Sequence, residues 1–238
     1  MSTAIGATFA GSTLSAFLQD LASSNPIPGG GSASAVAGAL AAGLVSMVAE
    51  LSVGRPRYAP FAATVERARA DGRRLASEFI ALADADAAAF AAYLDAARLP
   101  RGSEAEQQAR ARAIEAAARD AAEAPLQILV ACREVAQAAE RLAGRSNLGL
   151  ASDLAVASRL AEGAAHGAAE NVLINLPSLP DTAEAAALAT EVRQVLRSVK
   201  RLARATRAQV ATHTLREPEV RPRLSRRVVS ALAAREQR

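Results

Sequence analysis

The chain has very few of the side chains that usually carry metal, redox or nucleophilic chemistry. Its 238 residues include one cysteine, two histidines and no tryptophan, and Lys200 is the only lysine. The lone Cys132 excludes an internal disulfide framework and a cysteine-based zinc site, and it fits a reducing compartment, so we expect a cytoplasmic protein. Because His166 and His213 are far apart in the sequence, we expect no metal centre.

Aromatic residues are also scarce, at 3% of the chain. A β-sandwich needs β-branched and aromatic residues, so this composition disfavours one. Alanine is abundant instead, while glycine and proline gather at a few junctions. This is typical of long helices whose small side chains let the axes approach closely. The sequence therefore predicts an all-α fold, an antiparallel bundle of long helices in one domain.

The apolar periodicity and the Pro/Gly junctions divide the chain. We expect a disordered N-terminal tail over 1–11, a helical domain over 12–214 and a basic C-terminal tail over 215–238. The helices are expected at 13–21, 33–49, 58–97, 103–142, 150–176 and 182–214. Pro125 predicts a kink or a start point within the fourth of them.

Composition and charge disfavour two kinds of partner, a membrane and a nucleic acid. The run 33–49 approaches membrane-spanning length, but it is mostly small residues and Glu50 follows directly, so a helix buried in the protein is preferred to a membrane span. The formal net charge is +4. Arg221, Arg223 and Arg226 give the tail a basic character, yet no aromatic side chain lies among them to stack on bases. We expect neither a membrane nor a nucleic acid as a partner.

The most informative segment is 25–32, with the sequence Asn-Pro-Ile-Pro-Gly-Gly-Gly-Ser. Its prolines exclude a helix, and its glycines permit a tight turn into the apolar run that follows. Ser32 is the expected N-cap. The free N–H groups of such a helix start suit an anion or a carbonyl oxygen. A turn whose glycines only permit close packing is the alternative.

Acidic residues interrupt an apolar helix at Asp84 and Asp86. Asp86, Phe90 and Tyr93 share one helix face, whereas Asp84 points about 200° away from it. A carboxyl group buried in the bundle has a raised pKa and suits general acid–base catalysis. Solvent exposure of both acids is the alternative.

Two further polar groups lie later in the chain. Asn147, Ser152 and Asp153 surround a turn, where such residues are most often helix caps. Asn171 and Asn175 lie one turn apart on an apolar helix, where amides either tie helices together or bind a ligand. Asp153 and Asn171 lie about 27 Å apart along the helix, so one small substrate does not touch both; an elongated substrate or two subunits would be needed.

These motifs occur in an order that resembles the cyclodeaminase/cyclohydrolase family of folate one-carbon enzymes. The resemblance covers about residues 12–210. It rests on the segment 26–32, the 86–90 segment, Ala124-Pro125-Leu126, Asn147 with Ser152-Asp153, and Gly167 with Asn171-Val172 and Asn175-Leu176.

The resemblance implies a homodimer that acts on a tetrahydrofolate derivative without a further cofactor. Asp86 is the expected catalytic acid–base group, with Asp153 second. The implied substrate-binding residues line the glycine turn, the two polar clusters and the segment after the first long helix: Pro28, Gly29, Gly30, Gly31, Ser32, Arg55, Arg57, Tyr58, Asn147, Ser152, Asn171 and Asn175.

The chain departs from the family at Gly54-Arg55-Pro56-Arg57-Tyr58, where relatives carry a lysine-rich stretch. Arginine binds carboxylates through paired donors but does not readily transfer protons. Three functions therefore stay open: methenyltetrahydrofolate cyclohydrolase, which we favour, formiminotetrahydrofolate cyclodeaminase, and a catalytically inactive folate-binding or scaffold protein.

Overall fold

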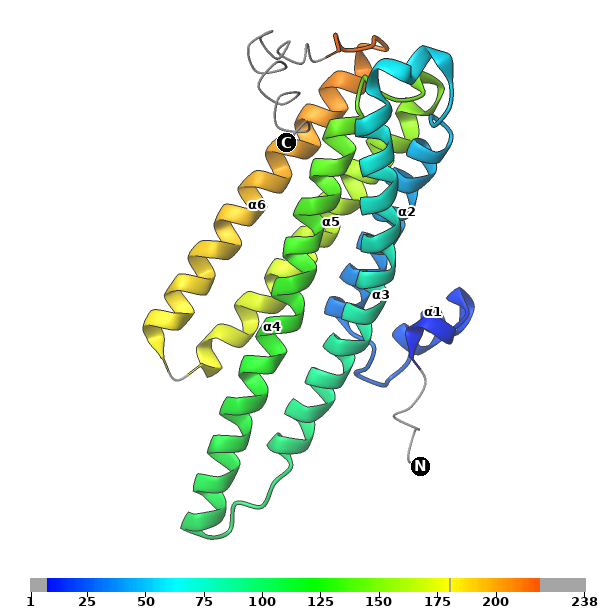
Figure 1. Cartoon of the computed structure of the whole chain (residues 1–238). Coiled ribbons are helices and arrows are strands. Elements are labelled where there is room, and N and C mark those ends of the chain that lie inside the picture. Colours follow the sequence, from blue (N-terminus) through cyan, green and yellow to red (C-terminus); the bar gives the residue numbers. More distant parts are fainter. Residues whose placement is uncertain (1–7, 180, 219–238) are drawn as a thin grey trace, which may run out of the picture.

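The computed structural model describes residues 8–179 and 181–218, and helices dominate them (Figure 1). No strand occurs in these ranges. The α-helices are α1 (Leu14–Leu21), α2 (Gly30–Glu50), α3 (Ala62–Ala97), α4 (Glu104–Leu142), α5 (Ala151–Asn175) and α6 (Thr182–Ala211). A short 3-10 helix, η1 (Phe9–Gly11), precedes α1, and three more lie between α-helices: η2 (Pro56–Phe61), η3 (Leu148–Leu150) and η4 (Leu176–Ser178). The prediction of an all-helical bundle is confirmed.

The five long helices pack side by side. Helix α2 packs against α3 and α5, and α4 packs against α3, α5 and α6. Helices that follow one another run in opposite directions, and the α3–α4 hairpin extends beyond the end of the other helices (Figure 1). Helix α1 lies apart from the long helices, near the start of α2. The long helices therefore define two ends of the bundle, and α2 runs from one end toward the other.

Side-chain caps fix where the helices begin. Ser103 and Glu106 form a capping box before α4, with Ser103 Oγ accepting from the Glu106 N–H at 3.3 Å. Asp181 caps α6, and its side chain accepts from the Ala183 and Glu184 N–H groups. The N-cap expectation for Ser32 is wrong: Gly29 is the N-cap of α2, and Ser32 lies inside its first turn. A helix start without a side-chain cap leaves the Ser32 hydroxyl available for another partner.

Two prolines lie within expected helices, and the structure shows a different effect for each. The expected helix over 58–97 begins instead with η2, because Pro60 has no N–H to donate, and α3 starts at Ala62. Pro125 lies inside an uninterrupted α4.

Of the two expected tails, 1–7 and 219–238 lie outside the described residues. Phe9 packs edge-on against Phe17, with ring centroids 5.3 Å apart.

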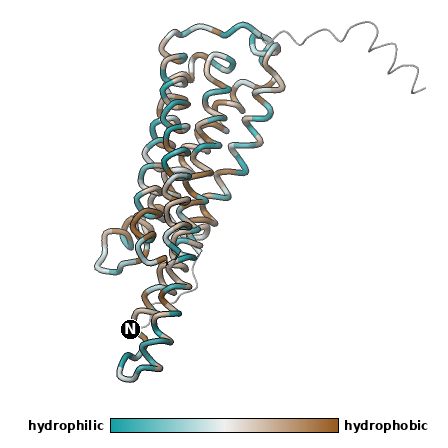
Figure 2. The backbone as a smooth tube through the Cα atoms, turned by 90° about the vertical axis from the view of Figure 1, so that its left-hand side faces the viewer, coloured by the Kyte–Doolittle hydropathy of each residue, from teal (hydrophilic) through white to brown (hydrophobic). Residues whose placement is uncertain are grey.

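The core is made of small side chains, so the helices come close together. Hydrophobic residues follow the middle of the bundle, and hydrophilic ones mark the tip of the α3–α4 hairpin (Figure 2). Two glycines permit the contact between α2 and α3. A Cβ at Gly38 would overlap the ring of Phe79, and one at Gly72 would lie 2.8 Å from the Ser46 nitrogen and 2.9 Å from the Ala42 oxygen.

We predict that Gly72→Ala destabilises the fold by about 1–3 kcal/mol, because the added methyl group meets the backbone of α2 and the helices must separate. Urea unfolding measures this change. Gly11→Ala is the control, since a Cβ there meets nothing within 4 Å. Equal stability of Gly72→Ala and the unmodified chain would show that the α2–α3 contact is looser than described.

Candidate functional site

The Asp86 carboxyl group of α3 lies against the first turn of α2. The Ser32 hydroxyl donates to Asp86 Oδ2 at 2.9 Å and also lies 3.2 Å from the Ala83 carbonyl oxygen. Gly31 is the reason that the carboxyl group fits, because a Cβ at this position would overlap Asp86 Oδ1. The two sequence motifs that are most distinctive, the glycine turn and the acid on α3, therefore meet in space.

This position raises the pKa of Asp86. Burial is the largest cause, because it disfavours the charged form, and hydrogen bonds from the Ser32 hydroxyl and backbone N–H act in the opposite direction. Asp86 is only half-buried, so one side of the carboxyl group still faces solvent. A partly desolvated carboxyl group with an open side suits proton exchange with a bound molecule.

The two asparagines of α5 lie at the same end of the bundle. Asn171 is beside Gly30: a Cβ on Gly30 would be 3.2 Å from Asn171 Nδ2. Gly167 permits this approach, because a Cβ there would overlap the hydroxyl of Ser34 on α2. Asn175 Nδ2 donates to the Ala121 oxygen of α4 at 3.0 Å, so Asn175 ties two helices together. Sequence reasoning named neither Gly167 nor Ser34 as positioning residues.

The other side chains near Asp86 have separate roles. Asp84 accepts the Phe9 N–H at 2.7 Å, which anchors the segment before α1 to α3. Phe90 and Tyr93 stack with their centroids 6.4 Å apart, and Phe90 is 38% exposed. They lie about one and two turns after Asp86 on the same helix face, toward the tip of the hairpin.

The remaining predicted residues lie at the opposite end of α2. The Tyr58 hydroxyl group contacts Asn147 Oδ1 at 3.4 Å and accepts from the Leu148 N–H at 3.3 Å. Ser52 Oγ accepts from the Asn147 N–H at 2.9 Å. These bonds hold the turn before α5 against the end of α2. Tyr58 is buried, so its hydroxyl group has a structural role that the sequence did not predict.

A hollow of about 460 Å³ lies at this second end. Its lining includes Ser52, Arg55, Tyr58 and Glu66. Arg57 follows Arg55 and Pro56 in the sequence and is exposed. Ser152 and Asp153 occupy the first turn of α5, where a carboxylate is favourable to the helix dipole.

The predicted site residues therefore form two groups. The first, which we call the glycine end, consists of Pro28, Gly29, Gly30, Gly31, Ser32, Asp86, Asn171 and Asn175. The second, which we call the turn end, consists of Arg55, Arg57, Tyr58, Asn147, Ser152 and Asp153. Helix α2 has 21 residues and rises about 1.5 Å per residue, so about 30 Å separates the groups within one chain.

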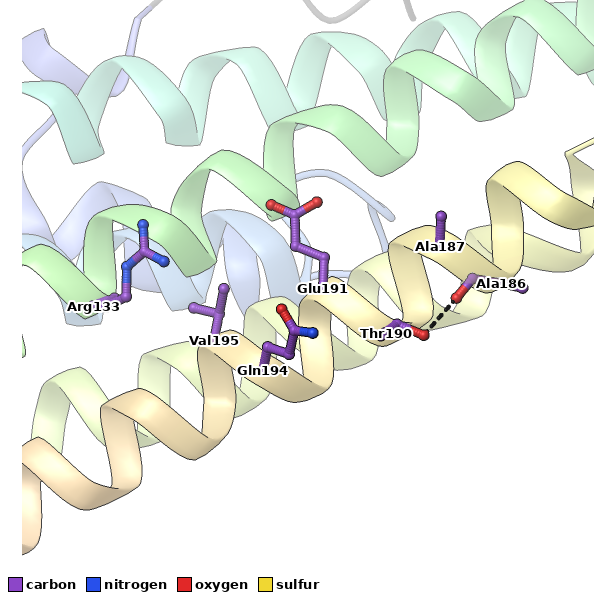
Figure 3. A pocket seen from close by; sticks show the side chains of 7 residues that line it. All are labelled: Arg133, Ala186, Ala187, Thr190, Glu191, Gln194 and Val195. Carbon is purple, nitrogen blue, oxygen red and sulfur yellow. Dashed lines mark hydrogen bonds between the residues drawn. The ribbon is translucent and has the colours of Figure 1, made fainter.

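A third feature carries none of the predicted residues. An open hollow of about 670 Å³ lies between α4 and α6, where Arg133 of α4 faces side chains of α6 (Figure 3). The Thr190 hydroxyl there donates to the Ala186 oxygen at 2.9 Å, as Figure 3 shows, so this group is already satisfied. Arg133 and Glu191 line the hollow without forming an ion pair with one another in the described structure.

The described residues give little support for a cysteine nucleophile or for a metal site. Burial raises the pKa of the Cys132 thiol to about 12, so it is protonated at neutral pH and is a poor nucleophile. No group of three His, Cys, Asp or Glu side chains is arranged to hold a metal ion in the ranges 8–179 and 181–218. The fold and site thus define a helical protein with a partly buried carboxyl group at a glycine-rich helix start.

Comparison with known proteins identifies the family. Residues 13–194 match the family described as formiminotransferase-cyclodeaminase, and the chain belongs to it. It is 38% identical over 171 residues to a methenyltetrahydrofolate cyclohydrolase from Methylorubrum extorquens, covering 72% of this chain and 82% of that protein. It is also 36% identical over 169 residues to mouse formimidoyltransferase-cyclodeaminase, where the match covers 71% of this chain and 31% of the mouse protein.

A solved structure has the same fold. Formiminotetrahydrofolate cyclodeaminase from Thermotoga maritima matches with a TM-score of 0.77 and 25% sequence identity. The match covers 85% of this chain and 98% of that one. The bundle described above is thus a fold that occurs in an experimentally solved member of the family.

We predict that Asp86→Asn changes how stability depends on pH. The pKa of Asp86 in the folded chain is raised above its ordinary value of 3.8, so ionisation costs more in the folded than in the unfolded state. The unmodified chain should therefore lose stability relative to Asp86→Asn as the pH rises from 3.8 through the folded pKa. Urea unfolding of both proteins over this range measures the difference, and a difference independent of pH would contradict the raised pKa.

Proposed function

We propose that this protein hydrolyses 5,10-methenyltetrahydrofolate to 10-formyltetrahydrofolate. The observation that carries the proposal is the half-buried Asp86 carboxyl group at the glycine turn. The 38% identity to a methenyltetrahydrofolate cyclohydrolase, over most of both chains, supports the choice of substrate.

The reaction needs one group that takes up a proton and later returns it. Water adds to the cationic methenyl carbon and gives a proton to the Asp86 carboxylate. The bond from this carbon to N5 then breaks, its electron pair stays on N5, and the carboxylic acid returns the proton there. The hydroxyl group on the same carbon releases its remaining proton to solvent and becomes the formyl carbonyl, so the reaction releases one proton overall. The carboxylate also stabilises the cationic substrate. A raised pKa favours the first step, because it makes the carboxylate a better base.

Binding would use backbone groups and cations. The first turn of α2 presents N–H groups around Gly30 and Gly31, which suit a carbonyl oxygen of the pterin. Phe90 offers an exposed aromatic face beside the acid. Arg55 and Arg57 would bind the glutamate carboxylates through paired donors. Because about 30 Å of α2 separates them from the glycine end in one chain, they would do so from a second protomer. We further propose that the protein works as a cytoplasmic homodimer, without a cofactor besides its folate substrate.

Cyclodeamination of formiminotetrahydrofolate is the second candidate. It is favoured by the names of the mouse and Thermotoga relatives and would use the same carboxyl group. In that reaction N10 attacks the formimino carbon, and the acid protonates the departing ammonia. Ammonia released from formiminotetrahydrofolate, measured next to the hydrolysis of methenyltetrahydrofolate, separates the two functions.

We predict that the purified protein accelerates the loss of methenyltetrahydrofolate absorbance and that Asp86→Asn lowers kcat by about 10²–10⁴-fold, because Asn cannot exchange a proton. Stopped-flow absorbance measures the rate. Asp84→Asn is the matched control, since Asp84 binds the Phe9 N–H away from the glycine turn. Folded protein with no rate above the spontaneous one would leave a folate-binding or scaffold role.

We predict that Gly31→Ala also lowers kcat, by at least about tenfold, because its methyl group displaces the carboxyl group on which proton transfer depends. Gly43→Ala provides the comparison. Gly43 lies later on the same helix, and a Cβ there would meet nothing within 4 Å. Gly43→Ala should keep most of kcat, and equal loss in both variants would contradict the role of Gly31.

A further inference from the structure

The Ser32 side chain is enclosed by protein, although it belongs to the glycine turn. Its exposed fraction is 0%, and the same holds for Ala83, whose carbonyl group it contacts on α3. A side chain without solvent-accessible surface does not touch a molecule that binds in the open part of the site. Any effect of Ser32 on a substrate must therefore pass through another group, and its hydroxyl group contacts the Asp86 carboxyl group.

The Ser32 hydroxyl group lies between two acceptors and has a single proton to donate. Its oxygen is 2.9 Å from Asp86 Oδ2 and 3.2 Å from the Ala83 carbonyl oxygen. An ionised carboxylate accepts a much stronger hydrogen bond than a neutral group does. The hydroxyl group therefore donates to Asp86 while this residue is ionised, and the Ala83 oxygen is the second acceptor when Asp86 becomes neutral.

The two oxygens of the Asp86 carboxyl group differ in their surroundings. Oδ2 accepts from the Ser32 hydroxyl group, whereas no side chain in the ranges 8–179 and 181–218 donates to Oδ1. Among the described residues, Arg141 Nε is the one fully enclosed side-chain nitrogen or oxygen without a hydrogen-bond partner. Oδ1 is thus not enclosed, and it is the oxygen that solvent or a substrate can reach.

Charged side chains do not set the protonation state of Asp86. Helix α2 carries no charge before Glu50, and Asp84 is bonded to the Phe9 N–H. The other acids of α4 and α5 near this end are exposed: Asp120, Glu123 and Glu170. Within the described residues, burial raises the pKa of Asp86 and the hydrogen bonds from Ser32 lower it. Ser32 is therefore the polar side chain that acts on this carboxyl group.

We propose that Ser32 is a positioning residue that holds Asp86 Oδ2, so that Oδ1 is the oxygen that exchanges the proton with the substrate. The proton that water releases forms a bond to Oδ1, and this O–H bond breaks when the proton passes to N5. Ser32 keeps its own proton throughout. It donates to Oδ2 while Asp86 is ionised and to the Ala83 oxygen while Asp86 is protonated.

The carboxyl group then keeps one orientation during both proton transfers, because only a hydroxyl hydrogen has to turn. This role differs from the substrate contact that the family resemblance implies for Ser32. The inference deepens the proposed function, on which its kinetic tests rest. The contact between Ser32 and Asp86 is tested separately, by a measurement that needs no activity.

The pKa of Asp86 provides that measurement. Ser32→Ala removes the donor and leaves burial in place, so the pKa of Asp86 should be higher than in the unmodified chain. Ser32→Cys has a side chain of similar size with only a weak donor, and it should raise this pKa as well. Carboxyl ¹³C resonances followed over pH give the pKa, and Asp86→Asn identifies the signal.

Ser158→Ala is the matched control for the loss of an enclosed hydroxyl group. Ser158 is also 0% exposed, and its hydroxyl group donates to the Ala155 oxygen at 2.8 Å within α5. Its variant should leave the pKa of Asp86 unchanged. An Asp86 pKa that is unchanged or lower in folded Ser32→Ala and Ser32→Cys, or that rises equally in Ser158→Ala, would overturn the proposal.

Steady-state kinetics test the positioning role. Ser32→Ala should lower kcat by about tenfold or more, because the carboxyl group is no longer held in one orientation. KM should stay close to the unmodified value, since Ser32 does not touch the substrate. The acidic limb of the kcat/KM profile should move to higher pH together with the pKa of Asp86. Ser158→Ala should keep both kcat and the profile, and a raised KM with unchanged kcat in Ser32→Ala would overturn the proposal.

A double-variant cycle tests whether Ser32 acts through Asp86. When Asp86→Asn has already removed the acid, adding Ser32→Ala should cause little further loss of kcat, because the two residues act as a unit. Losses that multiply in the double variant would overturn the proposal. An unmodified chain without activity would instead refute the proposed function, and the NMR comparison would still decide whether Ser32 holds Asp86.

Discussion

The account depends on the contact between the Asp86 carboxyl group and the first turn of α2. This contact exists because Gly31 has no side chain and because Ser32 faces α3 rather than capping its own helix. It removes part of the solvent from a carboxyl group, which raises its pKa, and it leaves another part of the group open. The same helix start presents backbone N–H groups, so the acid–base group and the anchoring site that we propose for the substrate meet at one short segment.

The alanine-rich core makes this contact possible. Small side chains bring α2 close to α3 and α5, and Gly38, Gly72 and Gly167 stand where any Cβ would meet a neighbouring helix. Asn171 and Asp86 consequently approach the glycine turn from two different helices. The length of α2 also keeps the glycine end and the turn end about 30 Å apart within a single chain.

Much of the fold could be predicted from the sequence, since periodicity, prolines and caps such as Asp181 mark the helices. The association of Asp86 with the glycine turn could be expected only from the order of the motifs, because periodicity does not say which helices are neighbours. The role of Ser32 was predicted wrongly, because capping is judged from local sequence and its partner lies on another helix. The bonds of Tyr58 and Ser52 to the turn before α5 also join distant segments and leave no local signal.

The most direct test is the titration of the Asp86 side chain itself. Carboxyl ¹³C resonances of the unmodified chain and of Gly31→Ala can be followed by NMR from acid to neutral pH, with Asp86→Asn identifying the signal. Desolvation against α2 predicts a pKa above the ordinary 3.8 in the unmodified chain and a value closer to 3.8 when the methyl group of Gly31→Ala displaces the carboxyl group. An Asp86 pKa at or below 3.8 in the unmodified chain would contradict the account.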